Sequence, residues 1–123
     1  MSSEALSYIR SLYPGKAKRA WHLLRVIAEH VSSERRQCCV GQHRLAFDAG
    51  GVSIKTVHRH LKCLEAGGFI TRWAQFNHDG GRAFDRIEIA GFDAWLDDQQ
   101  RRDHERTAQS FRQIWHVLQP NPD

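Results

Sequence analysis

The 123-residue chain has no long apolar run and contains few cysteines and prolines. No segment approaches the ~18 consecutive apolar residues that a membrane-spanning helix needs. Residues 1–13 contain no apolar stretch followed by a small-residue cleavage site, so we expect no secretion signal. These absences predict a cytoplasmic protein. The length predicts one compact domain with an extra helix at either end.

Cysteine is too scarce and too irregularly spaced for a disulfide framework or a zinc site. The three cysteines are an odd number, and Cys38 and Cys39 are adjacent, whereas zinc-binding pairs are separated by two residues. His58 and His60 are two residues apart on a predicted helix, so they do not face one ion. The sequence has neither a nucleotide-binding glycine loop nor a recognisable nucleophile–base pair. We therefore predict free buried thiols, no metal, no cofactor and no enzymatic activity.

Positive charge is concentrated in one part of the sequence. The net charge is +4, and residues 16–62 hold ten Lys and Arg against three Asp and Glu. Residues 92–123, by contrast, hold four against six. A local excess of positive charge permits a nucleic-acid partner for the first of these segments.

Hydrophobic periodicity predicts a mainly helical chain with one β-hairpin. Apolar residues recur at helical spacing in five segments, residues 5–13, 16–31, 42–49, 54–66 and 92–118. Ser53 is a good N-cap for the fourth helix, and Gly67-Gly68 ends that helix. Phe69–Phe76 and Arg82–Ala90 alternate as strands do, and the glycine-rich Asn77–Gly81 joins them into a hairpin. Residues 37–40 allow a very short additional strand.

This order of elements describes a helix-turn-helix followed by a wing. The segment Arg44–Arg72, RLAFDAGGVSIKTVHRHLKCLEAGGFITR, resembles the winged helix-turn-helix of GntR-type regulators and of plasmid and phage regulatory or replication proteins. The matching positions are Leu45-Ala46, Gly51-Val52-Ser53, Thr56-Val57, Arg59, Leu61, Leu64-Glu65 and Gly68-Phe69-Ile70. The chain departs from the usual pattern by one additional glycine in the turn between the two helices.

The resemblance implies a fold and a partner. The expected fold is mainly α with a small β-hairpin wing, in which a three-helix core and a two- or three-stranded sheet are flanked by N- and C-terminal helices. We expect a helical extension over residues 1–15, a DNA-binding domain over residues 16–91 and a C-terminal helix over residues 92–123. The implied partner is double-stranded DNA.

The predicted reading helix covers residues 53–66, with Ser53 as its N-cap. Val57, Leu61 and Leu64 define its buried side. The opposite side carries Lys55, Thr56, Arg59, Lys62 and Cys63. A helix fits the major groove and reads base edges from its N-terminal half, where Lys55, Thr56 and Arg59 lie.

The side chains of this helix receive different predicted roles. Arg59 is the leading base reader, because a guanidinium can bond guanine at two places at once. Ser53 and the N-terminus of the helix suit a phosphate. Lys62, near the far end, is predicted to meet the DNA backbone. The alternative is that these are ordinary solvated side chains.

Other residues are predicted to add phosphate or groove contacts. Phosphate contacts, which fix register but not sequence, are expected from Lys16, Lys18, Arg19, Gln42 and Arg44. In the wing, His78 and Arg82 could follow a minor groove or a phosphate row. For His78, an ordinary solvent loop is an equally good interpretation.

The last helix predicts a homodimer. Its apolar residues form two clusters, Phe92, Trp95 and Leu96 at its start and Phe111, Ile114, Trp115 and Leu118 near its end. We expect the first cluster to pack on its own domain and the second to meet another surface, either the first helix or a second subunit; the alternative is a helix that bends back. Two functions follow, a transcription regulator or a replication-initiation or protein-interaction module. Residues 1–123 contain no recognisable effector domain.

Overall fold

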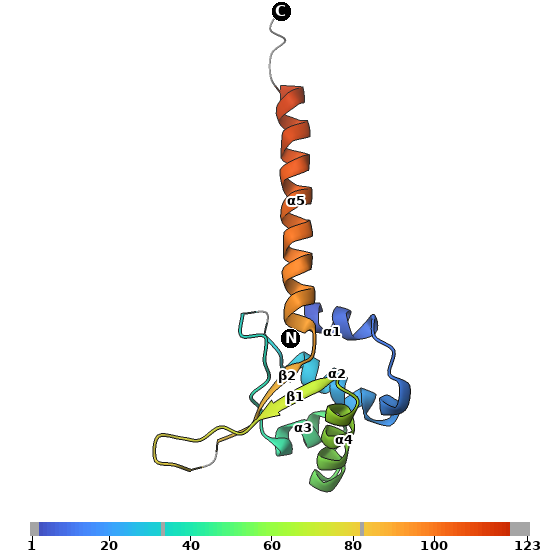
Figure 1. The fold of residues 1–123 in the computed structure, drawn as a ribbon, viewed down its shortest axis with the longest axis vertical. Helices are drawn as coiled ribbons and strands as arrows, with labels where there is room; N and C mark the ends of the chain where they lie inside the picture. The colour runs from blue at the N-terminus through green and yellow to red at the C-terminus, as the bar shows by residue number, and fades with distance from the viewer. Residues whose placement is uncertain (1–2, 33, 82, 119–123) are drawn as a thin grey trace, which may run out of the picture. The chain divides into compact units, whose positions relative to one another are not determined.

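The computed structural model describes residues 3–32, 34–81 and 83–118. The chain divides into two units, residues 1–92 and residues 93–123. The elements, in chain order, are α1 (Ser3–Arg10), the 3₁₀ helix η1 (Gly15–Ala20), α2 (Trp21–Glu29), α3 (Gln42–Asp48), α4 (Ile54–Ala66), β1 (Ile70–Trp73), β2 (Arg86–Ile89) and α5 (Phe92–Leu118). Figure 1 labels them. The fold is mainly α with one antiparallel hairpin, as the sequence predicts.

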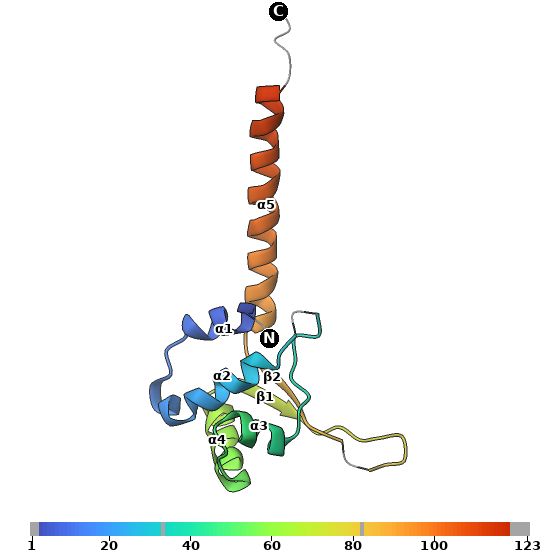
Figure 2. The ribbon, with the colours of Figure 1, turned by 180° about the vertical axis from the view of Figure 1, so that it is seen from behind.

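Helices α2, α3 and α4 enclose the core of the first unit, and the hairpin lies beside them (Figure 2). Each helix contributes apolar side chains at helical spacing, so that one face is buried and the other is solvated. The fully buried large side chains of these helices are Leu23, Leu24, Ile27, Leu45, Val57, Leu61 and Leu64. The buried side predicted for residues 54–66 is confirmed.

The turn between α3 and α4 accommodates the additional glycine without displacing the core. Gly50 and Gly51 have φ angles of 96° and 80°, which glycine adopts readily and other residues rarely do. The amides of Gly51 and Val52 both donate to the Ala46 carbonyl, over 2.9 and 3.2 Å. Leu45 and Ala46 therefore keep the inward positions that their spacing predicts.

The predicted helix over residues 16–31 is wrong at its start, because the chain forms η1 there and α2 begins only at Trp21. The Ala17 amide donates to the Pro14 carbonyl three residues earlier, over 3.0 Å. A 3₁₀ helix repeats every three residues, so Ala17 and Ala20 face the same way, and both are buried. The 3₁₀ helix thus buries both alanines on one side.

The strands are shorter than predicted. Ile70 pairs with Ile89 and Trp73 with Arg86, and the ladder ends there. Beyond Trp73 the strands have no core to cover, since residues 76–81 are all exposed. The predicted strand over residues 37–40 is reduced to one bridge, in which the amides and carbonyls of Cys38 and Ile87 exchange two bonds of 2.8 Å.

Within the first unit, helix α1 packs against α2 and buries Ala5, Tyr8 and Ile9. The Tyr8 hydroxyl donates to the Ala90 carbonyl over 2.6 Å, and its ring lies 5.9 Å from that of Phe92. The predicted helix ran to Tyr13, but α1 ends at Arg10 and the Tyr13 side chain is 86% exposed.

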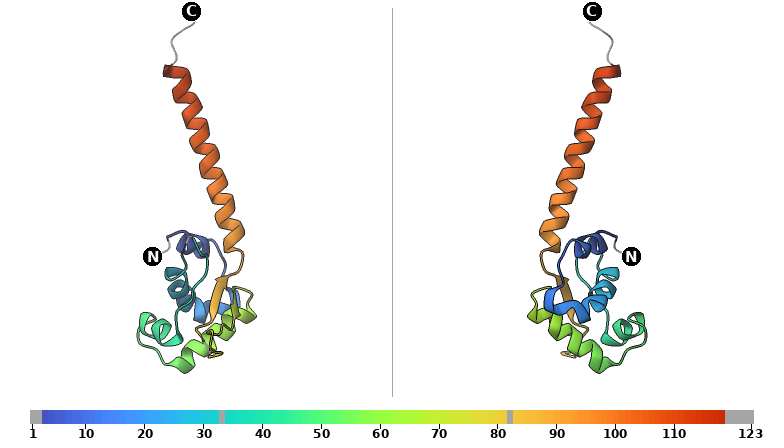
Figure 3. Two further views of the ribbon diagram at one scale, coloured as in Figure 1. Left: turned by 90° about the vertical axis from the view of Figure 1, so that its left-hand side faces the viewer. Right: turned by 90° about the vertical axis from the view of Figure 1, so that its right-hand side faces the viewer.

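Helix α5 is one continuous element of 27 residues, and Figure 3 shows it unbroken in two views. Most of its described side chains beyond residue 97 are exposed, including those of Phe111, Ile114 and Trp115. Within the residues that the structure describes, no helix combines the length and apolar character needed to cross a membrane.

Candidate nucleic-acid interface

The N-terminus of α4 is closed by the predicted cap. Ser53 has extended backbone angles, and its hydroxyl oxygen accepts a hydrogen bond from the Thr56 amide over 3.1 Å. The Thr56 hydroxyl lies 2.9 Å from the same oxygen. The Thr56 side chain is therefore half-buried and engaged with the cap. For this reason it is a weaker candidate for base contact than its position in the sequence predicts.

The outer side of α4 carries a stripe of cations. Lys55, Arg59 and Lys62 are all exposed and follow one another at intervals of four and three residues. This spacing places them on one side of a helix, opposite the buried Val57 and Leu61. We call these three residues the basic stripe.

The predicted contact residues of α3 lie near α4, because these two helices pack against each other. Gly41 is the N-cap of α3, and Gln42, directly after it, is half-buried. The Arg44 Nε donates to an Asp48 carboxylate oxygen over 2.9 Å and leaves most of the Arg44 side chain exposed. The Nε2 of His30, at the end of α2, lies 2.6 Å from the same oxygen. The hydrogen bonds from His30 and Arg44 lower the pKa of Asp48 below its usual value.

An arginine that sequence reasoning missed joins α4 to the hairpin. Arg72, on β1, donates from Nε to Glu65 of α4 over 2.6 Å. It also lies 3.9 Å from the carboxylate of Asp85, just before β2. The positive charge of Arg72 thus lies beside both carboxylates, which line the same groove as Lys62 of the basic stripe. No local motif marks this residue, since its partners are 7 and 13 positions away in the sequence.

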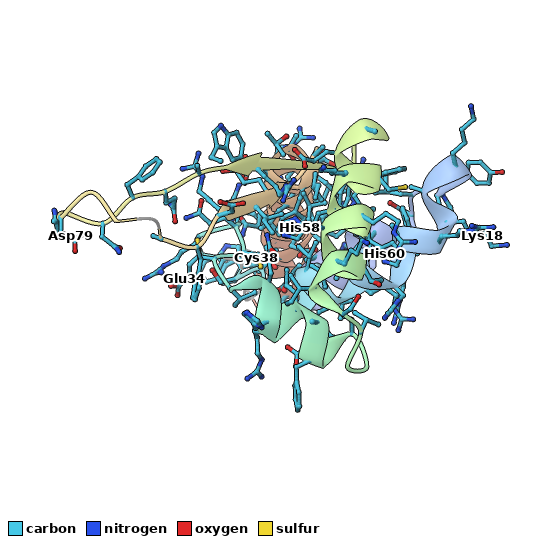
Figure 4. All side chains as sticks on the ribbon, turned by 90° about the horizontal axis from the view of Figure 1, so that it is seen from below. Lys18, Glu34, Cys38, His58, His60 and Asp79 are labelled. Atoms are coloured by element: carbon cyan, nitrogen blue, oxygen red, sulfur yellow. The ribbon has the colours of Figure 1, made fainter. Side chains whose placement is uncertain are left out.

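A polar groove runs between α4 and the base of the wing. It is lined by Gln42, His58, Lys62, Glu65, Arg72, Ala74 and Asp85. His58 is exposed on this side of the helix, although no role in DNA binding is predicted for it from the sequence. Figure 4 shows His58 and His60 on opposite sides of α4, with His58 toward the wing.

The remaining predicted contacts lie to either side of α4. Lys16, Lys18 and Arg19 are exposed on η1, which packs against α4. In Figure 4, Lys18 and the wing-tip residue Asp79 lie on opposite sides of this helix. His78 is exposed in the wing, and Arg82 lies outside the described residues.

The side chains that could bind a metal are dispersed. Within residues 3–32, 34–81 and 83–118, no three of the His, Cys, Asp and Glu side chains gather into a potential metal site. Cys38, Cys39 and Cys63 are free thiols, but the predicted burial is wrong for Cys39, which is exposed, and for Cys63, which is half-buried. Burial raises the pKa of the Cys38 thiol to about 11, so this residue remains protonated and unreactive at neutral pH.

Comparison with known proteins adds little to this geometry. No family model and no curated protein matches the chain. Among solved structures, the chain is similar to a possible transcriptional regulator from Methanosarcina mazei Go1, with a TM-score of 0.41 and 17% identity, covering 89% of this chain and 85% of that one. At this level of similarity the function has to be inferred from the side chains.

Proposed function

We propose that this protein binds double-stranded DNA in a sequence-specific manner and regulates transcription without catalysing a reaction. The observation that carries the proposal is the basic stripe, which lies on the solvated side of α4. Ser53 caps this helix, the opposite side of the helix is buried in the core, and the wing lies beside it. A phosphate backbone is the partner that three regularly spaced cations on a helix fit best, because each neutralised phosphate releases a counterion.

In this proposal α4 enters the major groove. Arg59 reads a base edge, with Lys55 beside it, and Lys62 meets the backbone. The capped N-terminus at Ser53 faces a phosphate, because its unpaired amides attract an anion. His58 joins the predicted set, since it lies in the groove that Lys62 also lines.

Phosphate contacts on both sides of α4 would set the register. Gln42 and Arg44 lie on α3, and the bond from Arg44 Nε to Asp48 leaves the terminal guanidinium nitrogens to donate to phosphate. On one side of α4 the contact with DNA would be extended by Lys16, Lys18 and Arg19. On the other side it would be extended by the wing residues His78 and Arg82. These contacts contribute affinity rather than sequence preference.

The active form in this proposal is a homodimer joined through α5. The rings of Phe111 and Trp115 stack with centroids 6.5 Å apart, and both are more than half exposed, as is Ile114. The occupant proposed for this face is a second copy, because a two-fold interface lets one apolar patch cover its own equivalent. One winged domain buries only ~600–1,000 Å² on DNA, and pairing two copies doubles the contacts.

Selection of bound duplexes from a random pool tests the function. We expect the full chain to select a two-part palindromic site, with an affinity that falls steeply as salt rises. Selection of no sequence, with weak binding that is alike for all duplexes, would favour the replication or protein-interaction module instead. Affinity that is unchanged from low to physiological salt would overturn DNA binding through the basic stripe.

A further inference from the structure

The wing continues beyond its two strands as a hydrogen-bonded hairpin. The Ala83 amide donates to the Gln75 carbonyl over 2.9 Å, and the Asn77 amide donates to the Gly81 carbonyl over 2.7 Å. At the tip, the Gly81 amide also donates to the Asp79 carboxylate over 2.8 Å. These bonds join residues 75 and 77 to residues 83 and 81, and the hairpin projects away from the helices (Figure 1).

Three aromatic residues of the wing expose much of their surface, but two of them have partners. The Arg86 guanidinium lies over the Trp73 ring, 4.5 Å from its centroid. The Phe84 ring lies over Gly41, where a Cβ atom would come within 2.8 Å of it. Their positions are therefore explained by packing within the domain.

Phe76 differs from these two residues. Its side chain is 66% exposed, and among the described residues it makes no ring or cation contact. Its place in the hairpin, between the Gln75–Ala83 and Asn77–Gly81 bonds, fixes the backbone that carries it. A largely exposed phenyl ring thus lies on the hairpin beside exposed polar residues, Asn77 and His78.

The location of this hairpin indicates what the ring meets. The wing leaves the sheet next to the polar groove that contains His58 and Lys62. A duplex that receives α4 in its major groove presents the adjacent minor groove to an element at the side of that helix. The minor groove is about 6 Å wide, and proteins that enter it frequently insert an apolar side chain between base pairs.

We propose that Phe76 is a wedge that enters the minor groove and partly unstacks one base step, bending the duplex toward its major groove at that step. This inference rests on the proposed DNA binding by α4 and adds a second source of specificity. Pyrimidine–purine steps unstack most easily, so the site would prefer TA or CA at a position where no hydrogen bond reads a base.

The experiment uses the full chain and the duplex that it selects, with 2-aminopurine at successive positions under the wing. The fluorescence of 2-aminopurine rises when its stacking is lost, and energy transfer between dyes at the two ends reports the bend. Phe76→Ala removes the ring, and Phe76→Leu keeps an apolar wedge. Phe47→Ala is the matched control, because Phe47 is 74% exposed on α3, outside the wing.

We expect the wild-type chain to raise the fluorescence at one step and to bend the duplex. Phe76→Ala should abolish both signals and weaken binding on the order of tenfold, while Phe76→Leu retains the bend and Phe47→Ala retains both signals. A bound duplex that stays stacked and straight, or a bend that survives in Phe76→Ala, overturns the wedge while leaving the role of α4 intact. A wild-type chain that binds no duplex overturns the proposed function itself.

Discussion

Helices α4 and α5 both present regular stripes of exposed side chains, and the two stripes differ in chemistry. The stripe of α4 is cationic and is backed by the buried Val57, Leu61 and Leu64. Near the end of α5 the exposed side chains of Phe111, Ile114 and Trp115 are apolar. Their surroundings differ as well, since residues 16–62 carry an excess of positive charge and residues 93–123 an excess of negative charge.

This difference separates two kinds of partner. Exposed cations are well hydrated and gain most from a polyanion, because binding releases its counterions. Exposed aromatic rings gain most from another apolar surface, and an acidic segment is repelled by DNA. We therefore propose DNA as the partner of the basic stripe of α4 and a second copy of the chain as the partner of α5, and each proposal can be tested separately.

The largest expected effect comes from truncating the buried side of α4. Leu64→Ala should lower the free energy of unfolding by about 2–5 kcal/mol, because the side chain is fully buried and leaves a cavity. Ile114→Ala in α5 should change it by less than about 0.5 kcal/mol in the monomer, since that side chain is exposed. Urea unfolding at a concentration below dimerisation measures both. Equal losses would mean that Ile114 is buried within its own chain.

The second effect concerns the face of α5. Phe111→Ser with Trp115→Ser should convert a dimer into a monomer and weaken binding to a two-part site by about a hundredfold, because the two domains no longer bind as one ligand. Affinity for a single half-site should stay unchanged. Sedimentation at micromolar concentration and titration of both duplexes give the answer. A wild-type chain that sediments as a monomer, or a double variant that remains dimeric, contradicts the assignment of α5.

A smaller and more selective effect is expected on the basic stripe. Arg59→Ala should cost about 1–3 kcal/mol on the selected site and relax the preference at one base position. Lys62→Ala, its control, should weaken binding to all sequences alike and reduce the salt slope by about one. Repeating the selection with each variant distinguishes the two roles. An unchanged sequence preference in Arg59→Ala would remove α4 from the major groove.

What could be predicted from the sequence was local. The Ser53 cap and the burial of Val57 and Leu61 follow from capping preference and helical period, and the structure confirms them. The lengths of the strands and the start of α2 were wrong, because both depend on where the core ends. The 3₁₀ helix buries Ala17 and Ala20, and no periodicity in the sequence predicts this helix.

The contacts that sequence reasoning missed join residues far apart in the chain. Arg72 bridges Glu65 and Asp85, Phe84 covers Gly41, and His30 meets Asp48. Each pair comes together only when the hairpin and helices pack. The roles of the twelve predicted contact residues on DNA remain predictions, because the structure shows where the described ones lie and not what they bind.

The smallest expected effect comes from two aspartates. The pKa is lowered in both, but one bonds residues of two helices and the other bonds residues of a single helix. In the first unit, Asp48 bonds His30, the C-cap of α2, and Arg44 of α3, and these bonds lower its pKa. In α5, Asp98 has its pKa lowered by the hydrogen bond from Arg101, helped by the charge of Arg102. Asp48 thus links two helices, whereas Asp98 makes these bonds within one helix.

A carboxyl whose folded pKa lies below its unfolded value, about 3.9, stabilises the fold at higher pH, and this contribution disappears as the pH falls through the folded pKa. Asp48→Asn should therefore lower the stability of the first unit at pH 7, and its difference from the wild type should shrink as the pH falls below about 3.9. Asp98→Asn should leave the stability of that unit unchanged at every pH, because its bonds are local to α5. Urea unfolding between pH 2 and pH 7, followed by tryptophan fluorescence, compares the variants. If Asp98→Asn destabilised the first unit as much as Asp48→Asn, α5 would share the cooperative fold of that unit and the contrast between the two helices would fail.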